Sequence, residues 1–494
     1  FLNMKKISIL VILFLFVQNV FCIEIVSKEY REQFSPEDLK SDYYKLQMKT
    51  ASFFDRQTSS VNGLVESHRG TSVYSYDFFS RSFILGSGGV LDAQAFIYDS
   101  AIASLAYLLA GQNNKVVKIL RVCQREFYSK KDESKLGLYN AYKTDVPRKR
   151  WGLTPGIDGN RVHLGPNIWI TISAFQYTAL TGKLDFLQFG LDSLKWASEI
   201  KHYKFSDGKL GAASMGYGWT PPDWSKIYST ENIVDHYAAL KMAREIYYNS
   251  NVDVKSYFEK ANYGIEDIES EIENIERWLV KLIYDKNKQT FNMGYNERGV
   301  DRTDALDTVS WAITALTPER LNELGIDPFY LMDFADEQYL VTDKIENQEI
   351  SGYDFTNQQG RRKNYRMIWF EGTCFHITTI QVMADYAEKL GKKELTEEYR
   401  KQAVNLLEEV ENASKLINLI DNSLPYTSKK PTEKQIFTTF ADYWEIPRGK
   451  NGSWVASSSS TGWRLIASSA FNPLHFNKET VDYKLFRNKK DSVN

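Results

Sequence analysis

The chain is poor in the residues that bind metals, form disulfides or attract nucleic acids. Its 494 residues include only three cysteines and six histidines, and none of these has the short spacing of a zinc site. The 61 basic and 63 acidic residues leave a net charge of −2, so the composition indicates no polyanion-binding face. We therefore expect no metal, no cofactor and no nucleic-acid partner.

Long apolar runs are equally scarce, and the one that stands out lies at the N-terminus. Lys5 and Lys6 precede the apolar stretch 7–17, which is too short for a comfortable membrane span. This pattern predicts a signal peptide over residues 1–22, and a lipid anchor on Cys22 is the alternative. The mature protein should then be secreted or periplasmic, with no membrane span left after cleavage.

What the chain does contain is a recurring helix-like segment rich in alanine, with starts roughly 60–90 residues apart. The six copies cover residues 98–109, 167–182, 229–240, 303–316, 369–387 and 460–470. They are apolar on nearly all sides, which predicts inner helices covered by protein all round. Amphipathic segments with one apolar face lie between them, over residues 34–54, 115–127, 185–200, 265–284 and 394–417. This alternation predicts an all-α fold, an (α/α)6 toroid with a double ring of inner and outer helices.

The loops before the inner segments are long and rich in Gly, Tyr, Trp and Asp, and in a toroid they gather on one face. No linker divides the chain, so we expect a single domain over residues 23–494 with a loosely ordered tail after about 476. Cys123 and Cys374 fall on segments that are not neighbours in a ring of six. Two buried free thiols are therefore expected rather than a disulfide.

Acidic side chains open several of the inner segments. They are Asp99, Glu231, Asp235, Asp304, Asp307 and Glu371. A single acid at a helix N-terminus is usually a cap, because free N–H groups and the helix dipole stabilise it. Acids at the mouths of four inner helices would instead converge, and like charges raise some of their pKa values. Hydrolysis of a glycosidic bond needs such a pair, one carboxyl protonated and the other ionised.

Glu371 is the first candidate for the proton donor. Trp369 and Phe370 precede it, and apolar surroundings keep a carboxyl group protonated. Gly372 is expected to let a ligand approach the backbone.

Glu231 is the second candidate, and Asp235 follows one helical turn later on the same face. Asp99 is a candidate for the base, and Asp304 for the base or for a ligand of sugar hydroxyls. Asp307 faces much as Asp304 does, and is equally well explained as a buried partner of an arginine.

Further candidates for substrate contact are aromatic or imidazole side chains in or beside the predicted mouth loops. They are Trp151, Trp219, Trp224, Trp369, Trp454 and His163. His236 and His376 lie within helices and are better explained as hydrogen-bonded core residues. The basic loop runs 148–150 and 361–363 are solvated surface or contacts for an acidic polysaccharide.

With these residues in view, the chain resembles the (α/α)6-barrel carbohydrate-active enzymes. It is similar to secreted bacterial members with Tyr-Asp-x-Ala-x-Ala-x-x-Ala, Ser-Thr-Glu-Asn-x-x-Asp and Trp-Phe-Glu-Gly-Thr in their first, third and fifth inner helices. These motifs occur here at residues 98–106, 229–235 and 369–373. The resemblance covers about residues 54–476 and implies a toroidal fold and a sugar substrate.

The leading hypothesis is thus an exported glycoside hydrolase that cleaves a polysaccharide or oligosaccharide in a cleft at the mouth of the barrel. A polysaccharide lyase acting on uronates is the alternative. His163, Tyr217, Asn232 and Arg366 are available for it. A non-catalytic sugar-binding protein is a third possibility, and an isoprenoid cyclase is disfavoured because the chain has no true Asp-rich motif.

Overall fold

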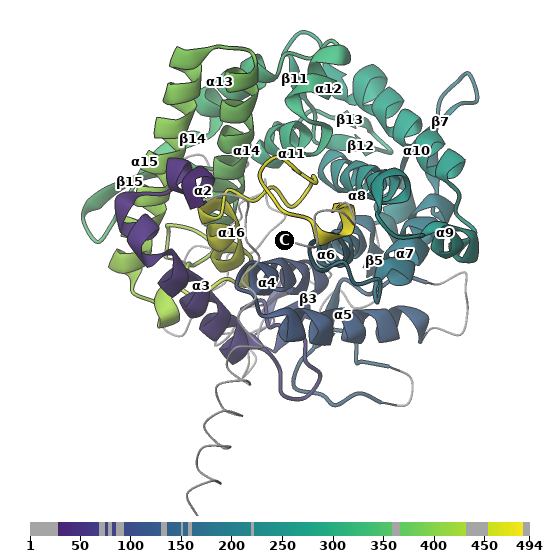
Figure 1. Cartoon of the computed structure of the whole chain (residues 1–494), viewed down its shortest axis with the longest axis horizontal. Coiled ribbons are helices and arrows are strands. Elements are labelled where there is room, and N and C mark those ends of the chain that lie inside the picture. The colour runs from purple at the N-terminus through teal and green to yellow at the C-terminus, as the bar shows by residue number, and fades with distance from the viewer. Residues whose placement is uncertain are drawn as a thin grey trace, which may run out of the picture.

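The computed structural model describes residues 28–68, 75–77, 82–84, 93–129, 136–149, 152–156, 161–218, 222–357, 366–430 and 453–487. Within these ranges six helices form a closed inner ring, seen end-on in Figure 1. They are α4 (Ile97–Leu109), α6 (Leu164–Thr181), α8 (Thr230–Asn249), α11 (Leu306–Leu316), α14 (Phe370–Lys389) and α16 (Ser458–Ser468). Each packs against the next along the chain, and α16 returns to α4. The predicted (α/α)6 toroid is confirmed.

The inner helices are buried almost all round, as their composition predicts. Every residue of α4 except Tyr98 is buried, and α16 is buried along its whole length. Small residues let neighbouring helices approach closely. A Cβ atom on Gly462 of α16, for example, would lie 2.5 Å from Ile102 of α4.

Amphipathic helices form the outer layer, at the positions that their one-sided apolar patterns indicate. They are α3 (Glu37–Gln57), α5 (Asn113–Tyr128), α7 (Leu187–Glu199), α10 (Ile265–Trp278) and α15 (Lys393–Ile417). Shorter additions are α2 (Lys28–Phe34), α9 (Lys255–Ala261) and a π-helical turn (Leu279–Ile283) that continues α10. Each of the five longer helices contacts one or two inner helices.

The apolar pattern predicts no outer helix between α11 and α14, but the structure has two there. These are α12 (Pro318–Glu323) and α13 (Pro328–Tyr339). Each starts with proline in its first turn and with a capping side chain, since Thr317 accepts from the Arg320 N–H and Asp327 from the Phe329 N–H. These start signals were readable in the sequence, whereas the helices are too short for a strong apolar period.

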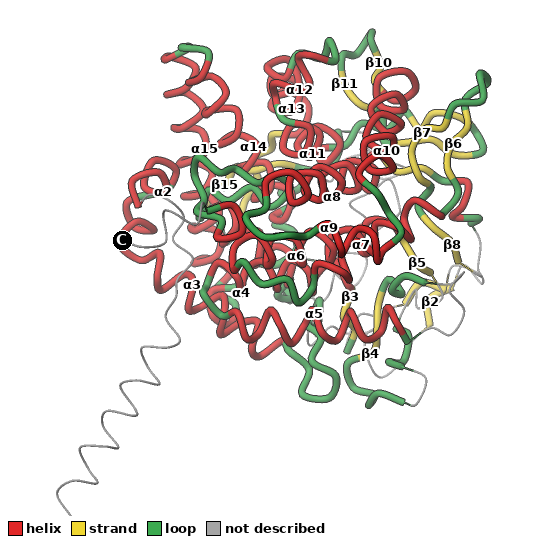
Figure 2. The backbone as a smooth tube through the Cα atoms, turned by 45° about the vertical axis from the view of Figure 1, so that its right-hand side comes forward, coloured by secondary structure: helices red, strands yellow, loops and turns green. Residues whose placement is uncertain are grey.

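Short antiparallel strands organise the loops at the N-terminal end of the ring. The pairs are β1 (Ser75–Asp77) with β2 (Ser82–Ile84), β3 (Gln94–Phe96) with β4 (Ala141–Lys143), β5 (Arg161–His163) with β8 (Gly216–Gly218), β6 (His202–Lys204) with β7 (Leu210–Ala213), β10 (Tyr284–Asp285) with β11 (Thr290–Phe291), and β14 (Leu340–Ile345) with β15 (Gln348–Tyr353). β12 (Gly294–Asn296) pairs with both β9 (Tyr228–Ser229) and β13 (Gly299–Asp301). Because β3, β5 and β9 run directly into α4, α6 and α8, they fix where those helices begin. Figure 2 shows most strands gathered toward one side of the molecule.

The C-terminal segment closes the opposite end of the ring. The Gln176 side-chain amide of α6 donates to the Pro473 carbonyl at 2.9 Å, and the Asn472 amide donates to the Thr314 carbonyl of α11 at 2.9 Å. This segment, yellow in Figure 1, lies across the middle of the ring.

Residues 477–487 pack against the protein, although the sequence analysis expected a loosely ordered tail after about 476. Leu485 is fully buried, and the rings of Phe476, Tyr483 and Phe486 contact one another at 5.1–5.9 Å. The tail is polar in average composition, but its few apolar side chains are spaced so that they cover the ends of α6 and α8.

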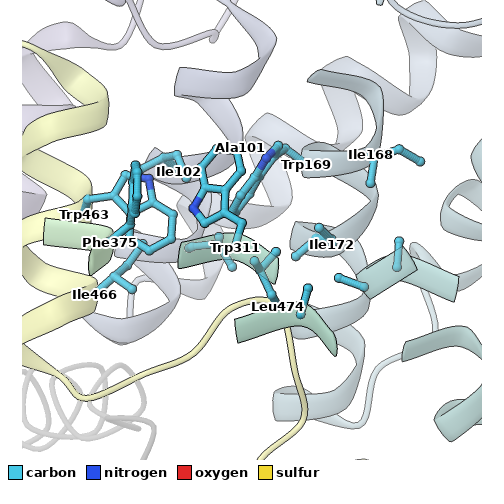
Figure 3. Close-up of a cluster of buried hydrophobic side chains, with 14 of the residues drawn as sticks. Ala101, Ile102, Ile168, Trp169, Ile172, Trp311, Phe375, Trp463, Ile466 and Leu474 are labelled. Carbon is cyan, nitrogen blue, oxygen red and sulfur yellow. The ribbon is translucent and has the colours of Figure 1, made fainter. Parts of the chain in front are cut away.

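Aromatic side chains fill the centre of the circle formed by the six inner helices. Trp169, Trp311, Phe375 and Trp463 come from α6, α11, α14 and α16, and successive ring centroids lie 5.1–5.9 Å apart (Figure 3). The rings therefore form a solid floor beneath the N-terminal end.

The two described cysteines, Cys123 and Cys374, are buried and free, as predicted. None of the described helices combines the length and apolarity needed to cross a bilayer.

Candidate active site

Acidic side chains from four inner helices face one another at the N-terminal end of the ring. They are Asp99 of α4, Glu231 and Asp235 of α8, Asp307 of α11 and Glu371 of α14. After burial, which has the largest effect on both glutamates, the charges of Asp307, Asp235 and Glu371 raise the pKa of Glu231, and those of Asp99 and Asp307 raise the pKa of Glu371. The structure thus brings together five of the six acids that the sequence analysis singled out.

Glu371 is held by two hydroxyl groups. The Tyr98 hydroxyl donates to its Oε1 at 2.5 Å, and the Ser459 hydroxyl donates to its Oε2 at 2.8 Å. The indole N–H of Trp463 donates to the Tyr98 oxygen at 2.8 Å, which fixes the tyrosine in turn. Burial is the largest effect on Glu371 and raises its pKa to about 8, against the lowering effect of the Tyr98 and Ser459 hydrogen bonds.

Gly372 has a packing role rather than the predicted role in ligand approach. A Cβ atom at this position would lie 2.2 Å from the indole of Trp369, so glycine is needed to let that ring fold back over the helix start. Trp369 is itself buried and contacts the rings of Phe355, Phe375 and Tyr426. It lies in the wall of the site, and Tyr426 is the more exposed of the two rings.

Glu231 is the least enclosed of the acids. It lies in the first turn of α8 and keeps part of its surface accessible to solvent. Among the described residues, no hydrogen bond ends on its carboxyl group. Burial, followed by the charges of three neighbouring carboxyls, raises its pKa well above the usual value.

Asp235 and Asp307 lie deeper and are almost completely buried. Both oxygens of Asp235 and the Oδ1 of Asp307 have no hydrogen-bond partner among the described residues. Burial raises the pKa of Asp307 to about 7 and that of Asp235 well above its usual value. The Trp169 indole lies near Asp235 and lowers its pKa, which offsets part of the effect of burial. The two groups do not form a hydrogen bond of normal geometry.

Asp99 is buried behind Ser459. Burial raises its pKa to about 6, while hydrogen bonds from the Ser67 hydroxyl and the Ser459 backbone N–H oppose that shift. Since Ser459 also donates to Glu371, Asp99 supports the position of Glu371 through the serine.

Asp304 is paired with a cation. Lys288 Nζ lies 3.0 Å from its Oδ1 and 3.1 Å from its Oδ2. The sequence left open a buried arginine partner for Asp307, three residues later, but the cation found among the described residues is Lys288, and it pairs with Asp304. Asp304 precedes α11 whereas Asp307 lies in its first turn, so the two side chains leave the backbone in different directions.

The peripheral aromatic candidates are spread around the mouth. The His163 and Trp224 rings lie 4.5 Å apart, and the Arg161 guanidinium lies 4.9 Å above Trp224. Burial, with the charge of Arg161 second, lowers the pKa of His163 to about 3. Trp454 carries the Lys430 ammonium 4.0 Å above its ring. Trp151, Trp219 and the predicted signal peptide lie outside the described residues.

The two helical histidines lie in the core. His376 Nδ1 is hydrogen-bonded with the Ser310 hydroxyl at 2.8 Å. His236 is equally buried, but neither of its ring nitrogens has a partner among the described residues. Burial lowers the pKa of both, so both imidazoles are neutral.

Tyr98, Ser459 and Tyr426 were not among the residues selected from the sequence, and for Trp463 core packing was an equally good explanation. The four consecutive serines 457–460 at the start of the sixth inner helix were a readable signal, because helix starts face the mouth. Tyr426 gave no local signal. Its pKa is raised by burial and then by the charges of four of the acids, which places its ring against the same cluster.

Among the described residues, no three side chains of His, Cys, Asp or Glu are arranged to hold a metal ion.

Comparison with solved structures shows the same fold in glycosidases. A wild-type glycosidase matches with a TM-score of 0.52 and 10% identity, over 89% of this chain and 100% of that one. A glycosidase variant in complex with glucose matches with a TM-score of 0.53 and 9% identity, over 88% of this chain and 98% of that one. At this level of identity the matches establish the toroid and nothing finer. No family profile and no curated protein sequence matches the chain.

Proposed function

We propose that the protein is an exported glycoside hydrolase that cleaves a polysaccharide or oligosaccharide between Glu231 and Glu371. The observation that carries this proposal is the convergence of these two glutamates, from α8 and α14, beside a floor of aromatic rings. Sugar hydroxyl groups can donate to the carboxyl oxygens, and the C–H faces of sugar rings pack on aromatic side chains. The shared fold with glycosidases supports the same conclusion.

The chemistry needs one proton donor and one ionised carboxylate. The donor gives its proton to the glycosidic oxygen as the C–O bond breaks, and the bonding electrons stay on that oxygen. The carboxylate either takes a proton from the attacking water or attacks the sugar carbon itself, and water completes the reaction. Burial raises the pKa of both glutamates above the usual range, that of Glu371 to about 8, so a carboxyl group of this pair can hold its proton near neutral pH.

Two of the four residues named for the lyase alternative have structural partners, and the tyrosine beside the acids is a poor base. Burial, followed by Glu371, raises the pKa of Tyr98 well above its usual value, so this tyrosine is a poor base. Tyr217 donates to the Leu136 carbonyl at 2.6 Å, and Arg366 is paired with Asp354 at 3.1 Å. Both are engaged in structural contacts.

The test is incubation of the protein with a set of neutral and acidic polysaccharides, scored by new reducing ends and by ultraviolet absorbance. A hydrolase yields reducing ends without absorbance, whereas a lyase forms a C=C bond that absorbs. Glu231→Gln and Glu371→Gln should each abolish cleavage, and Glu297→Gln, an exposed partner of Lys226, is the matched control that should not. Absorbing products would reject the proposal, as would cleavage that survives both substitutions.

A further inference from the structure

The two glutamates of the proposed site are not equivalent, and their contacts differ in kind. Glu371 receives two hydroxyl hydrogens, whereas Glu231 receives none from the described residues. We infer that Glu231 carries the proton to the leaving sugar, while Glu371 acts in its ionised form. Asp235 and Asp307, buried behind Glu231, are the positioning residues that impose this order. The roles rest on the proposed function; the order of proton loss does not.

The donors around Glu371 favour its carboxylate form. An indole N–H can only donate, so the Tyr98 oxygen accepts from Trp463 and the tyrosine hydrogen is left for Glu371. Ser459 supplies a second hydrogen to the other carboxyl oxygen. Two such donors stabilise an ionised carboxyl group and offer little to a neutral one. Glu371 is therefore prepared to lose its proton first.

Glu231 is in the opposite situation. Asp235 lies one turn further along α8, and Asp307 approaches from α11. Both are buried, and three of their four oxygens have no hydrogen-bond partner among the described residues. A negative charge on Glu231 would add to an uncompensated acidic pair, which costs free energy in a low-dielectric interior. Glu231 therefore keeps its proton after Glu371 has lost it.

Each element packed around this end of α8 contributes acidic or neutral groups. α11 contributes Asp307, α14 contributes Glu371, and α4 contributes Tyr98. Tyr426 lies close enough that the charge of Glu231, after burial and the charges of Glu371 and Asp99, raises its pKa. Helix α6 contributes Trp169, which lies near Asp235. Among the described residues, the charges that act on Glu231 are all carboxylates. No cation there opposes the effect of Asp235 and Asp307.

This order reverses the first choice drawn from the sequence. Trp369 and Phe370 do precede Glu371, but the hydroxyl groups that reach it come from α4 and α16. In the assigned reaction Glu231 protonates the glycosidic oxygen as the C–O bond breaks. Glu371 receives a proton from water or forms a transient bond to the sugar carbon.

The order of proton loss can be measured on the free full-length protein. Infrared difference spectra report the C=O stretch of protonated carboxyl groups, which disappears when they ionise. As pH rises, the band removed by Glu371→Gln should be lost first. The band removed by Glu231→Gln should persist to a pH at least about one unit higher.

The positioning role has its own variants. Asp235→Asn and Asp307→Asn each remove a negative neighbour and should lower the pH at which the Glu231 band is lost by about one unit or more. Glu276→Gln is the matched control: Glu276 is buried but paired with Arg320 at 2.6 Å, so its loss should leave both bands unchanged. If the order is reversed, or if both aspartate variants leave the Glu231 band in place, the inference is wrong.

A second readout applies once a cleaved sugar is known. The phenol of a suitable aryl glycoside leaves without protonation, so on this substrate the rate of the Glu231→Gln variant should fall by less than about tenfold. On the natural linkage, which needs the proton, the rate of the same variant should fall by at least about 10²-fold. Glu371→Gln should lose activity on both. A chain that titrates as described but cleaves no sugar refutes the proposed function alone. A chain that cleaves sugar with the opposite order refutes only this inference.

Discussion

The two ends of the inner ring are built from the same six helices, yet they bury chemically different polar groups. At the C-terminal end, Gln176 and Asn472 donate to the backbone carbonyls of Pro473 and Thr314. At the N-terminal end, Asp235 and Asp307 are buried with three oxygens unpartnered among the described residues. One end is closed by the chain itself, and the other holds acidic groups whose oxygens lack partners among the described residues.

This difference indicates where stability has been given up for function. A buried, unpaired carboxyl group destabilises the fold unless it is protonated. Folding alone would favour an apolar or paired side chain at both ends. Acids without partners at the mouth, beside Glu231 and Glu371, are the pattern expected of an active site.

The largest expected effect is on catalysis at the mouth. Glu371→Gln keeps the shape of the side chain but removes the ionisable group, so the rate of sugar cleavage should fall by about 10³-fold or more. Reducing-end release from the cleaved polysaccharide measures it, with Glu297→Gln as the surface control. A loss of less than tenfold would show that Glu371 is not required for catalysis.

The next effect is on the pH dependence of stability. The pKa of Asp307 is raised from 3.8 to about 7 in the folded chain. The folded chain therefore keeps a proton that the unfolded chain has lost, and stability falls as pH rises between these values. At about 1.4 kcal/mol per unit, the loss attributable to Asp307 is up to about 4 kcal/mol.

Asp307→Asn cannot ionise, so it should gain stability relative to the parent chain across that pH interval. Urea unfolding at a series of pH values measures the difference in unfolding free energy. A difference that stays constant from acid to neutral pH would show that Asp307 does not titrate in the fold.

At the opposite end, the effect should be smaller and independent of pH. Leu485 is fully buried against the end of the ring. Leu485→Ala leaves a cavity and should cost about 3 kcal/mol of unfolding free energy at every pH. Activity of the folded protein should be unchanged. A loss of sugar cleavage in folded Leu485→Ala would contradict the separation of the two ends.

The smallest effect concerns the hydroxyl that holds Glu371. Tyr98→Phe removes a donor to the ionised carboxyl, so the pKa of Glu371 should rise further above about 8. The rising limb of kcat/KM against pH should then move to higher pH, with roughly a tenfold loss of rate at neutral pH. An unchanged limb would mean that the Tyr98 hydrogen bond does not set the ionisation of Glu371.

Much of the fold was predictable because the buried faces of helices are made of apolar residues, which are easily recognised in the sequence. Inner helices such as α4 and α6 are apolar all round, and outer helices such as α5 and α10 have one apolar face. The helices α12 and α13 were missed because short helices contain too few residues to show a helical repeat of apolar side chains. The packing of residues 477–487 was missed because their few apolar side chains are scattered among polar ones.

The site was predictable in its acids but not in their partners. Position at the start of an inner helix is a local property, so Glu231, Asp235 and Glu371 could be selected from sequence. Whether Asp304 or Asp307 has a cation partner depends on Lys288, which comes from a different loop. Tyr98 and Ser459 reach Glu371 from helices far away along the chain, and no spacing rule links them to it.

The most direct test of the central claim is cleavage of polysaccharides by the parent chain, Glu231→Gln and Glu371→Gln, scored side by side. The account predicts new reducing ends without ultraviolet absorbance from the parent chain, and none from either variant. Absorbing products, or a parent-like rate from both variants, would contradict it.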